Sequence, residues 1–335
     1  MDKTRSKPVK SNNKAQMKAV FIEQYGNAEK LILGELETPH IESNQVLIKV
    51  AAAGVNPVDF HIRNGMLEGT DTHQLPLVLG WDVAGEVVEM GDNVSDLKLN
   101  DQVFAFSDIG KQGTYAQYVA VDAPLVALKP KNLDMIQAAA VPLAAITAWQ
   151  ALTRDAGLTP SNAKDKRVFI QNASGGVGGF AVQIAHYLGA HVIASASGAK
   201  EAYVKSLGAD EFIDYKTQDF TESVKEVDVV LSAIGGQENL TKSLTVIKEG
   251  GKLVSTLDEL APNTHIPNKV HFIRMWVQPD GNDLAKIAEL IEAEKISIQL
   301  DSVYPLEEAK AAQERSEAGK ATGKIVLNIA AHEFV

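Results

Sequence analysis

The most informative absence in this 335-residue sequence is cysteine, which does not occur at all. Without cysteine the chain has no disulfides, no thiolate nucleophile, no iron–sulfur cluster and no thiolate-bound zinc. Aromatic residues are few, at 6%, but the hydrophobic content of 45% is ordinary for a globular protein. At about 150 residues per domain, the length predicts two domains that each bury a core.

Long apolar segments and an excess of positive charge are also missing. The longest apolar run, Ala138 to Trp149, is interrupted by Pro142 and Thr147 and is well short of the about 20 residues that span a bilayer. The formal net charge of -11 argues against a general nucleic-acid-binding surface. We therefore predict a cytoplasmic protein with neither a membrane nor a nucleic acid as partner.

Basic residues are concentrated at the N-terminus. Residues 1–18 carry six lysines or arginines and one acidic residue, Asp2, and lack the apolar segment of a secretory signal. A contact with an anionic surface is one interpretation, but a solvated extension is the commoner case. We predict a disordered basic extension over residues 1–16 and a fold that begins at Met17.

The pattern of secondary structure changes near residue 130. Before it, short β-rich segments separated by Gly, Pro and Asn are typical of a compact β-rich domain. The Ala-rich stretch Ala138–Leu152 predicts a long helix, and from Arg167 strands alternate with helices, which predicts an α/β fold with a doubly wound parallel sheet. The predicted strands there are 167–172, 191–195, 211–214, 228–233 and 252–256, and the predicted helices are 177–188, 199–207, 220–225 and 238–248.

A glycine-rich turn is the strongest indication of function. A strand-like segment runs into Ala173-Ser-Gly-Gly-Val-Gly-Gly179, and an amphipathic helix follows and stops at Gly189. This context fits the dinucleotide fingerprint G-x-G-x-x-G, in which glycines let the backbone approach a pyrophosphate at the helix start. A tight turn without a ligand is the alternative. The predicted cofactor residues of the turn are Ala173, Ser174, Gly175, Gly176, Val177 and Gly178.

The end of the next predicted strand bears on which dinucleotide binds. NAD sites place an acidic residue there on the ribose 2′-hydroxyl, whereas the segment 193–200 contains none. Ser195, Ser197 and Lys200 offer two hydroxyls and a charge to a 2′-phosphate, and Tyr215 adds a hydroxyl from the following strand. NADPH is therefore the predicted cofactor, with a merely solvated Lys200 as the alternative.

Six segments carry a resemblance to a known family. They are GVNPVDFHIRNG at 54–65, PLVLGWDVAGEVV at 76–88, GTYAQYV at 113–119, AVPLAAITAW at 140–149, the glycine-rich turn at 173–179 and GKIVL at 323–327. In this order they resemble the medium-chain dehydrogenase/reductase superfamily and, within it, the zinc-independent quinone oxidoreductase branch. The resemblance implies a GroES-like β-rich catalytic domain over residues 17–138 and 299–335, a Rossmann domain over residues 139–298, a cleft between them, and commonly a homodimer.

The positions of the zinc ligands separate two reaction types. Zinc alcohol dehydrogenases of this superfamily hold their catalytic zinc through Cys, His and Cys, and the corresponding positions here are Asn56, Trp81 and a residue near Leu143. None is a usual zinc ligand, so we predict no metal. Hydride delivery to a conjugated acceptor needs less Lewis-acid help than alcohol oxidation. The expected substrate is therefore a quinone or an α,β-unsaturated carbonyl compound; an NADPH-binding redox sensor or structural protein and an enoyl-thioester reductase are the alternatives.

The resemblance also implies candidate catalytic residues. Asn56 would line the nicotinamide end of the cleft, or only cap a turn. His61 stands where related quinone reductases often have tyrosine, and is a candidate proton donor unless it is a surface or packing residue. Trp81 would form a wall of the acceptor pocket or pack in the core. Thr147 would touch nicotinamide or substrate, or bond to its own helix.

Further residues are assigned by their place at strand ends. Loops at the carboxyl ends of such sheets face the cofactor, which predicts contacts from Ser232, Ile234, Ser255 and Thr256. Lys324, just before the last predicted strand, is expected to reach the pyrophosphate. Arg63 and Asp82 are expected to pair and to tie two loops of the first domain.

Overall fold

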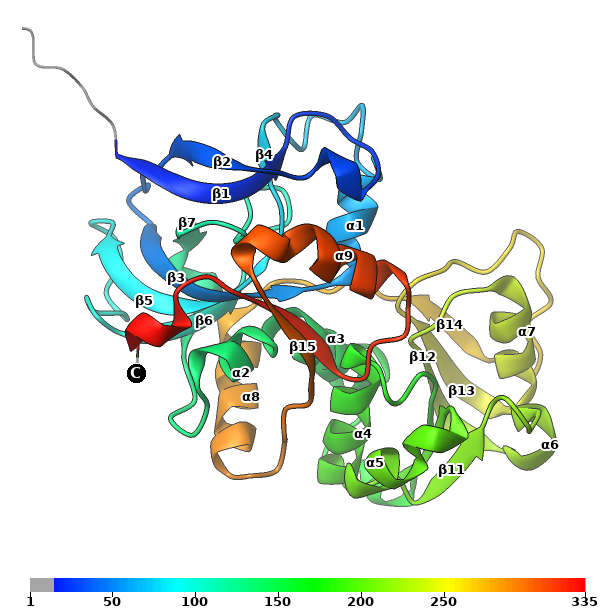
Figure 1. Ribbon diagram of the computed structural model, residues 1–335. Coiled ribbons are helices and arrows are strands. Elements are labelled where there is room, and N and C mark those ends of the chain that lie inside the picture. The colour runs from blue at the N-terminus through cyan, green and yellow to red at the C-terminus, as the bar shows by residue number, and fades with distance from the viewer. Residues whose placement is uncertain (1–14, 335) are drawn as a thin grey trace, which may run out of the picture.

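Three sheets, two in a first unit and one in a second, organise the residues that the computed structural model describes, 15–334. In Figure 1 the first unit, blue to teal with the red C-terminal segment, lies to the left of the green and yellow second unit. The first unit holds a seven-stranded sheet in the order β15-β16-β3-β5-β6-β8, with β7 paired to β3, and a small sheet in the order β2-β1-β4. No helix within residues 15–334 has the length and apolar character to cross a membrane.

Strand β3 (Gln45–Val55) is the centre of the first unit. It pairs antiparallel with β5, β7 and β16 and is buried along nearly its whole length, which explains its almost continuous apolar sequence. The other strands are β1 (Gln16–Ile22), β2 (Ile32–Glu37), β4 (Leu77–Val78), β5 (Asp82–Met90), β6 (Gln102–Phe106), β7 (Tyr118–Asp122), β8 (Val126–Leu128), β15 (Leu300–Pro305) and β16 (Lys324–Asn328).

The second unit is a parallel six-stranded sheet in the order β11-β10-β9-β12-β13-β14. This is the doubly wound order of a dinucleotide-binding fold, so the predicted fold class is confirmed. Its strands are β9 (Arg167–Ile170), β10 (His191–Ala196), β11 (Glu211–Asp214), β12 (Val227–Ser232), β13 (Ile247–Ser255) and β14 (His271–Arg274). Its helices are α4 (Gly176–Leu188), α5 (Glu201–Ser206), α6 (Phe220–Ser223) and α7 (Gln237–Thr245).

The end of the chain returns to the first unit. Strands β15 and β16 complete the seven-stranded sheet, and α9 (Ala309–Glu317) packs on α1 (Pro57–Arg63), as Figure 1 shows. The backbone N–H of Gly323 donates to Ser174 O at 3.0 Å, so the segment before β16 contacts the glycine-rich turn directly. The domain boundaries at residues 138 and 298 remain predictions.

Some sequence-based expectations need correction. The single helix predicted over Ala138–Leu152 is two helices, α2 (Met135–Ala139) and α3 (Pro142–Gln150), because Pro142 cannot continue a helix and instead begins one. Helix α8 (Gly281–Glu292) packs against α3. The first strand of the described residues begins at Gln16, one residue before the expected start. Residues 1–14 of the predicted extension lie outside the described residues.

Candidate active site

The glycine-rich turn connects β9 to α4 and has room only for glycine at its third motif position. A Cβ on Gly178 would lie 2.1 Å from Asn172 O, and one on Gly175 would lie 2.8 Å from the Asn172 amide nitrogen. The turn is also fixed by the bond from Ala173 N–H to Ser195 O, at 2.9 Å. The first N–H groups of a helix lack partners within the helix, so this cradle at the start of α4 suits a pyrophosphate.

A cavity of 870 Å³ lies beside the turn, at the carboxyl ends of the parallel strands. It brings together three predicted cofactor residues, Ser195, Tyr215 and Ile234. Lys216 lines the same cavity but is not among the predicted cofactor residues, because that prediction rested on the residue that follows β10. Lys216 directly follows Tyr215 at the end of β11, and this position would have been enough to predict that it lies near the cofactor. The lining offers hydroxyls and two lysines to the adenosine end of a dinucleotide: Lys216, and Lys242, which forms ion pairs with Asp219 and Glu238.

Ser197 and Lys200 flank this cavity without being among its lining residues. They surround Gly198, where a Cβ would lie 2.6 Å from the Asp214 carboxylate. A carboxylate from β11 therefore approaches the loop that sequence reasoning described as free of acid. Asp214 also accepts the N–H of Lys216 at 3.0 Å, which fixes the turn that carries Tyr215 and Lys216.

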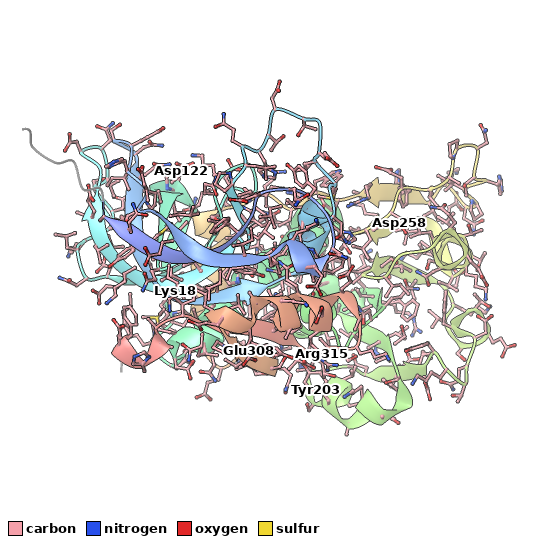
Figure 2. The ribbon with its side chains drawn as sticks, turned by 45° about the horizontal axis from the view of Figure 1, so that its top comes forward. Lys18, Asp122, Tyr203, Asp258, Glu308 and Arg315 are labelled. Atoms are coloured by element: carbon pink, nitrogen blue, oxygen red, sulfur yellow. The ribbon has the colours of Figure 1, made fainter. Side chains whose placement is uncertain are left out.

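The hydroxyls predicted after β12 and β13 are engaged in their own loops. Ser232 Oγ donates to Ile234 O at 3.2 Å, and Thr256 Oγ1 donates to Ser232 O at 3.3 Å. Ser255 Oγ donates to Asp258 O at 2.7 Å, and the Asp258 carboxylate, labelled in Figure 2, accepts from Gly236 N–H at 2.6 Å. Of the predicted residues in these loops, Ile234 lines the cavity, whereas Ser232, Ser255 and Thr256 do not.

A buried polar cluster lies where the first unit meets the turn. Asn56 Nδ2 donates to Asp82 Oδ2 at 2.8 Å, and Lys324 donates to Asn56 Oδ1. Asp59 Oδ2 accepts from Asn56 N–H at 2.8 Å and from Tyr115 OH at 2.6 Å. All five side chains are buried. Asp59 and Tyr115 were missed, because their partnership joins segments far apart in the chain.

Burial governs the electrostatics of this cluster. It raises the pKa of Asp59 to about 7, although the hydrogen bonds from Tyr115 and Asn56 act in the opposite direction. It also raises the pKa of Asp82 and lowers the pKa of Lys324, while the attraction between these two charges opposes both shifts. A single cation therefore faces two carboxyl groups, one of which, Asp59, is partly protonated near neutral pH.

Lys324 is placed differently from its predicted role. Its stem lines a crevice of 10 Å³ together with Gly175, Gly176 and Tyr203, the last labelled in Figure 2. Its ammonium donates to Val55 O at 3.2 Å and to Asn56. The charged end is thus bound on the first-unit side of the glycine-rich turn.

The predicted pair between Arg63 and Asp82 is wrong. Arg63 donates to Gln313 Oε1 at 2.6 Å and forms an ion pair with Glu317 at 3.0 Å, whereas Asp82 lies 3.8 Å from Lys324 Nζ. Gln313 and Glu317 belong to α9, whose return over α1 is not visible in the local sequence.

The other candidate catalytic residues match their simpler alternatives. Trp81 is fully buried and donates from Nε1 to Lys111 O at 3.2 Å, and Thr147 Oγ1 donates to Leu143 O at 2.7 Å within α3. His61 lies exposed on α1. Partial burial of its ring lowers its pKa, an effect that the charge of Glu317 opposes.

The donor set does not fit zinc. Asn56 Oδ1 already accepts from an ammonium group, and an indole has no lone pair for a metal. Across residues 15–334, no three or more His, Cys, Asp or Glu side chains are grouped so as to hold a metal ion.

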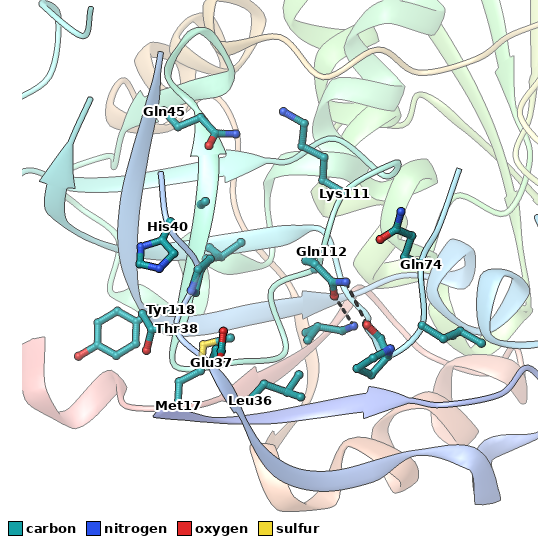
Figure 3. Close-up of a pocket in the computed structure, with 17 residues that line it drawn as sticks. Met17, Leu36, Glu37, Thr38, His40, Gln45, Gln74, Lys111, Gln112 and Tyr118 are labelled. Carbon is teal, nitrogen blue, oxygen red and sulfur yellow. Dashed lines mark hydrogen bonds between the residues drawn. The ribbon is translucent and has the colours of Figure 1, made fainter. Parts of the chain in front are cut away.

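A separate cavity of 520 Å³ lies in the first unit, and Figure 3 shows its lining. Gln112 closes one side by accepting from Val78 N–H at 2.8 Å and donating to Pro76 O at 3.0 Å. None of the predicted site residues lines it.

Comparisons with known proteins agree with this geometry. Residues 42–131 match the alcohol dehydrogenase GroES-like domain, and residues 207–327 match the zinc-binding dehydrogenase family. The chain is 40% identical to the chloroplastic NADPH-dependent alkenal/one oxidoreductase of Arabidopsis thaliana, over 93% of this chain and 79% of that protein. It is 38% identical to the 2-methylene-furan-3-one reductase of Solanum lycopersicum, over 94% and 79%.

A solved structure extends the likeness to three dimensions. The quinone oxidoreductase from Coxiella burnetii superposes with a TM-score of 0.86 at 31% identity, covering 94% of this chain and 100% of that one. The chain therefore belongs to the medium-chain dehydrogenase/reductase superfamily, in its quinone oxidoreductase-like branch, and is an oxidoreductase that uses a nicotinamide cofactor.

Proposed function

We propose that the protein reduces a quinone or an α,β-unsaturated carbonyl compound with NADPH and without a metal ion. The observation that carries this proposal is the pairing of a dinucleotide cradle with Asn56 and Trp81 at the positions where zinc relatives keep their ligands. The relatives named as alkenal/one and quinone oxidoreductases support the acceptor class.

The residues present fit NADPH. The glycine-rich turn from Gly175 to Gly178 would hold the pyrophosphate, and Ser195, Tyr215 and Lys216 would surround the 2′-phosphate in the 870 Å³ cavity. When bound, NADPH supplies the hydride. The approach of Asp214 to Gly198 opposes a second negative charge there, so Lys216 is the residue on which the preference for NADPH depends.

The chain's own contribution is orientation and the placing of a proton. The enclosed polar cluster around Asn56 fixes the part of the first unit that would face the nicotinamide of a bound cofactor. Reduction leaves negative charge on the acceptor oxygen, which takes a proton from water or from His61. Because the lowered pKa leaves His61 mostly neutral at pH 7, we assign water the larger share.

We also propose a cytoplasmic homodimer. The support is the outer edge of β14, which ends the sheet, and the nearby Trp276, whose side chain stacks with Arg274 and is 61% exposed.

The test is turnover of purified protein with NADPH and a panel of quinones, enones and enoyl thioesters, with metal content measured on the same sample. Oxidation of NADPH with a quinone or enone and no bound zinc supports the proposal. Binding of NADPH with no turnover across the panel supports the alternative of a redox sensor or structural protein. Turnover of enoyl thioesters alone supports the enoyl-thioester reductase alternative.

A further inference from the structure

Lys324, Asn56 and Asp82 form a closed set of contacts at the junction of the two units. Lys324 begins β16, Asn56 directly precedes α1, and Asp82 begins β5. Lys324 donates to Asn56 Oδ1, Asn56 Nδ2 donates to Asp82 Oδ2 at 2.8 Å, and Lys324 Nζ lies 3.8 Å from the same carboxylate oxygen. The second oxygen of Asp82 accepts from Leu143 N–H, at the start of α3, at 2.7 Å.

These contacts fix which way the Asn56 amide faces. An ammonium has only donors and a carboxylate only acceptors, so the amide oxygen must face Lys324 and the amide nitrogen must face Asp82. An amide nitrogen carries two N–H groups, and the contacts among residues 15–334 account for one of them. The second N–H is therefore held in a set direction as a donor.

The same contacts oppose a role for the Lys324 ammonium at the phosphates. Its stem passes the first residue of α4, because a Cβ on Gly176 would lie 3.0 Å from Lys324 Cδ. The ammonium then continues to Val55 O and Asn56. Moving it to a phosphate would leave Asp82, which is fully buried, without its cation, and an unpaired buried charge is costly.

We propose that Lys324 is a positioning residue: together with Asp82 it orients the Asn56 amide so that its free N–H donates to the carbonyl oxygen of the acceptor. The assignment rests on the proposed reductase function. It predicts that Lys324 acts on the reaction step and has little effect on cofactor affinity.

The experiment separates binding from turnover in three variants. Lys324→Met keeps the stem and removes the charge. Lys216→Met removes one of the two lysines that line the 870 Å³ cavity, the one that does not pair with Asp219. Lys269→Met removes a lysine whose side chain is 83% exposed. The Kd for NADPH is measured without acceptor, and kcat is measured with the best acceptor at saturating NADPH. We expect Lys324→Met to lower kcat by about tenfold or more with Kd changed by less than about threefold, Lys216→Met to raise Kd by about tenfold, and Lys269→Met to change neither.

A raised Kd with unchanged kcat in Lys324→Met would make this residue a phosphate ligand and overturn the proposal. Because the single variant leaves Asp82 unpaired, Lys324→Met/Asp82→Asn serves as a second test without a lone buried charge. A loss of kcat that persists in this folded double variant supports positioning, and its recovery to the wild-type kcat contradicts it. A wild-type protein without turnover contradicts the proposed function, and the assignment of Lys324 falls with it. Normal wild-type turnover together with a raised NADPH Kd and an unchanged kcat in Lys324→Met overturns the assignment alone.

Discussion

Lys324 and Asp82 form an ion pair that is almost completely enclosed, with Nζ 3.8 Å from Oδ2 and side chains that are 4% and 0% exposed. Removing one partner leaves the other buried and uncompensated. We expect Lys324→Met to lower the free energy of unfolding by about 3–5 kcal/mol. Urea denaturation measures this loss, and the double variant Lys324→Met/Asp82→Asn should recover part of it. Equal losses in the single and double variants would show that the pair is not coupled.

Two neighbouring glycines are expected to respond differently to alanine. Gly178→Ala places a Cβ 2.1 Å from the backbone oxygen of Asn172, so we expect a loss of about 1–3 kcal/mol of stability. Gly176→Ala meets only the flexible stem of Lys324 at 3.0 Å, and should change stability by less than about 1 kcal/mol. Gly176 belongs to the predicted pyrophosphate cradle at the start of α4, so we expect the added methyl group to raise the Kd for NADPH. Thermal unfolding and NADPH titration of both variants test this; equal stabilities would contradict it.

The buried carboxyl group of Asp59 makes stability depend on pH. Its pKa is about 7 in the folded protein against an ordinary value of 3.8, so between these values the folded state binds more protons than the unfolded state. The free energy of unfolding should therefore fall as pH rises from about 4 to 7 and level off above. In Asp59→Asn the amide oxygen can still accept the hydrogen bonds from Tyr115 OH and Asn56 N–H, but the side chain no longer titrates.

The measurement is the difference in free energy of unfolding between wild type and Asp59→Asn across this pH range. Subtraction removes the contributions that both proteins share, including that of Asp82. We expect the free energy of unfolding of Asp59→Asn to increase relative to that of the wild type as pH rises. A difference that stays constant would place the Asp59 pKa near its ordinary value.

Arg63 joins α1 to α9, and its two partners on α9 differ in exposure. Gln313 is fully buried, as is Arg63, whereas the Glu317 side chain is 42% exposed. Arg63→Met leaves Gln313 Oε1 without its donor, and we expect a loss of about 3 kcal/mol. Glu317→Gln should cost less than about 1 kcal/mol, because an exposed carboxylate is stabilised by water. Denaturant midpoints of Arg63→Met and Glu317→Gln measure the two losses of stability. Similar losses would contradict the claim that the buried contacts of Arg63 stabilise the fold more than its ion pair with Glu317.

Local sequence signals were sufficient for the parallel sheet and the glycine-rich turn. Strand β12 is buried along its whole length, and its sequence is apolar apart from Asp228 and Ser232 near its two ends. Gly178 is set by a neighbour only six residues away, Asn172. Features of this kind depend on residues that are close together in the sequence, so pattern and spacing are enough to predict them.

The polar cluster could not be predicted in the same way. Lys324 and Asn56 are separated by 268 positions, and Arg63 and Gln313 by 250, so their contacts depend on how β16 and α9 return to the first unit. Residue type alone suggested a phosphate for Lys324 and a charge partner for Arg63. In the structure both cations are buried beside acceptors of another element: Lys324 of β16 beside Val55 and Asn56, and Arg63 of α1 beside Gln313 of α9.

The central claim is hydride transfer from NADPH to a conjugated acceptor. The most direct measurement uses NADPH with deuterium at C4 of the nicotinamide in the transferred position, an enone as acceptor, and mass spectrometry of the product. We expect one deuterium on the carbon β to the carbonyl and a solvent-derived hydrogen on the α carbon. Consumption of the labelled NADPH without deuterium in the product, or no consumption with any quinone or enone, would contradict the claim.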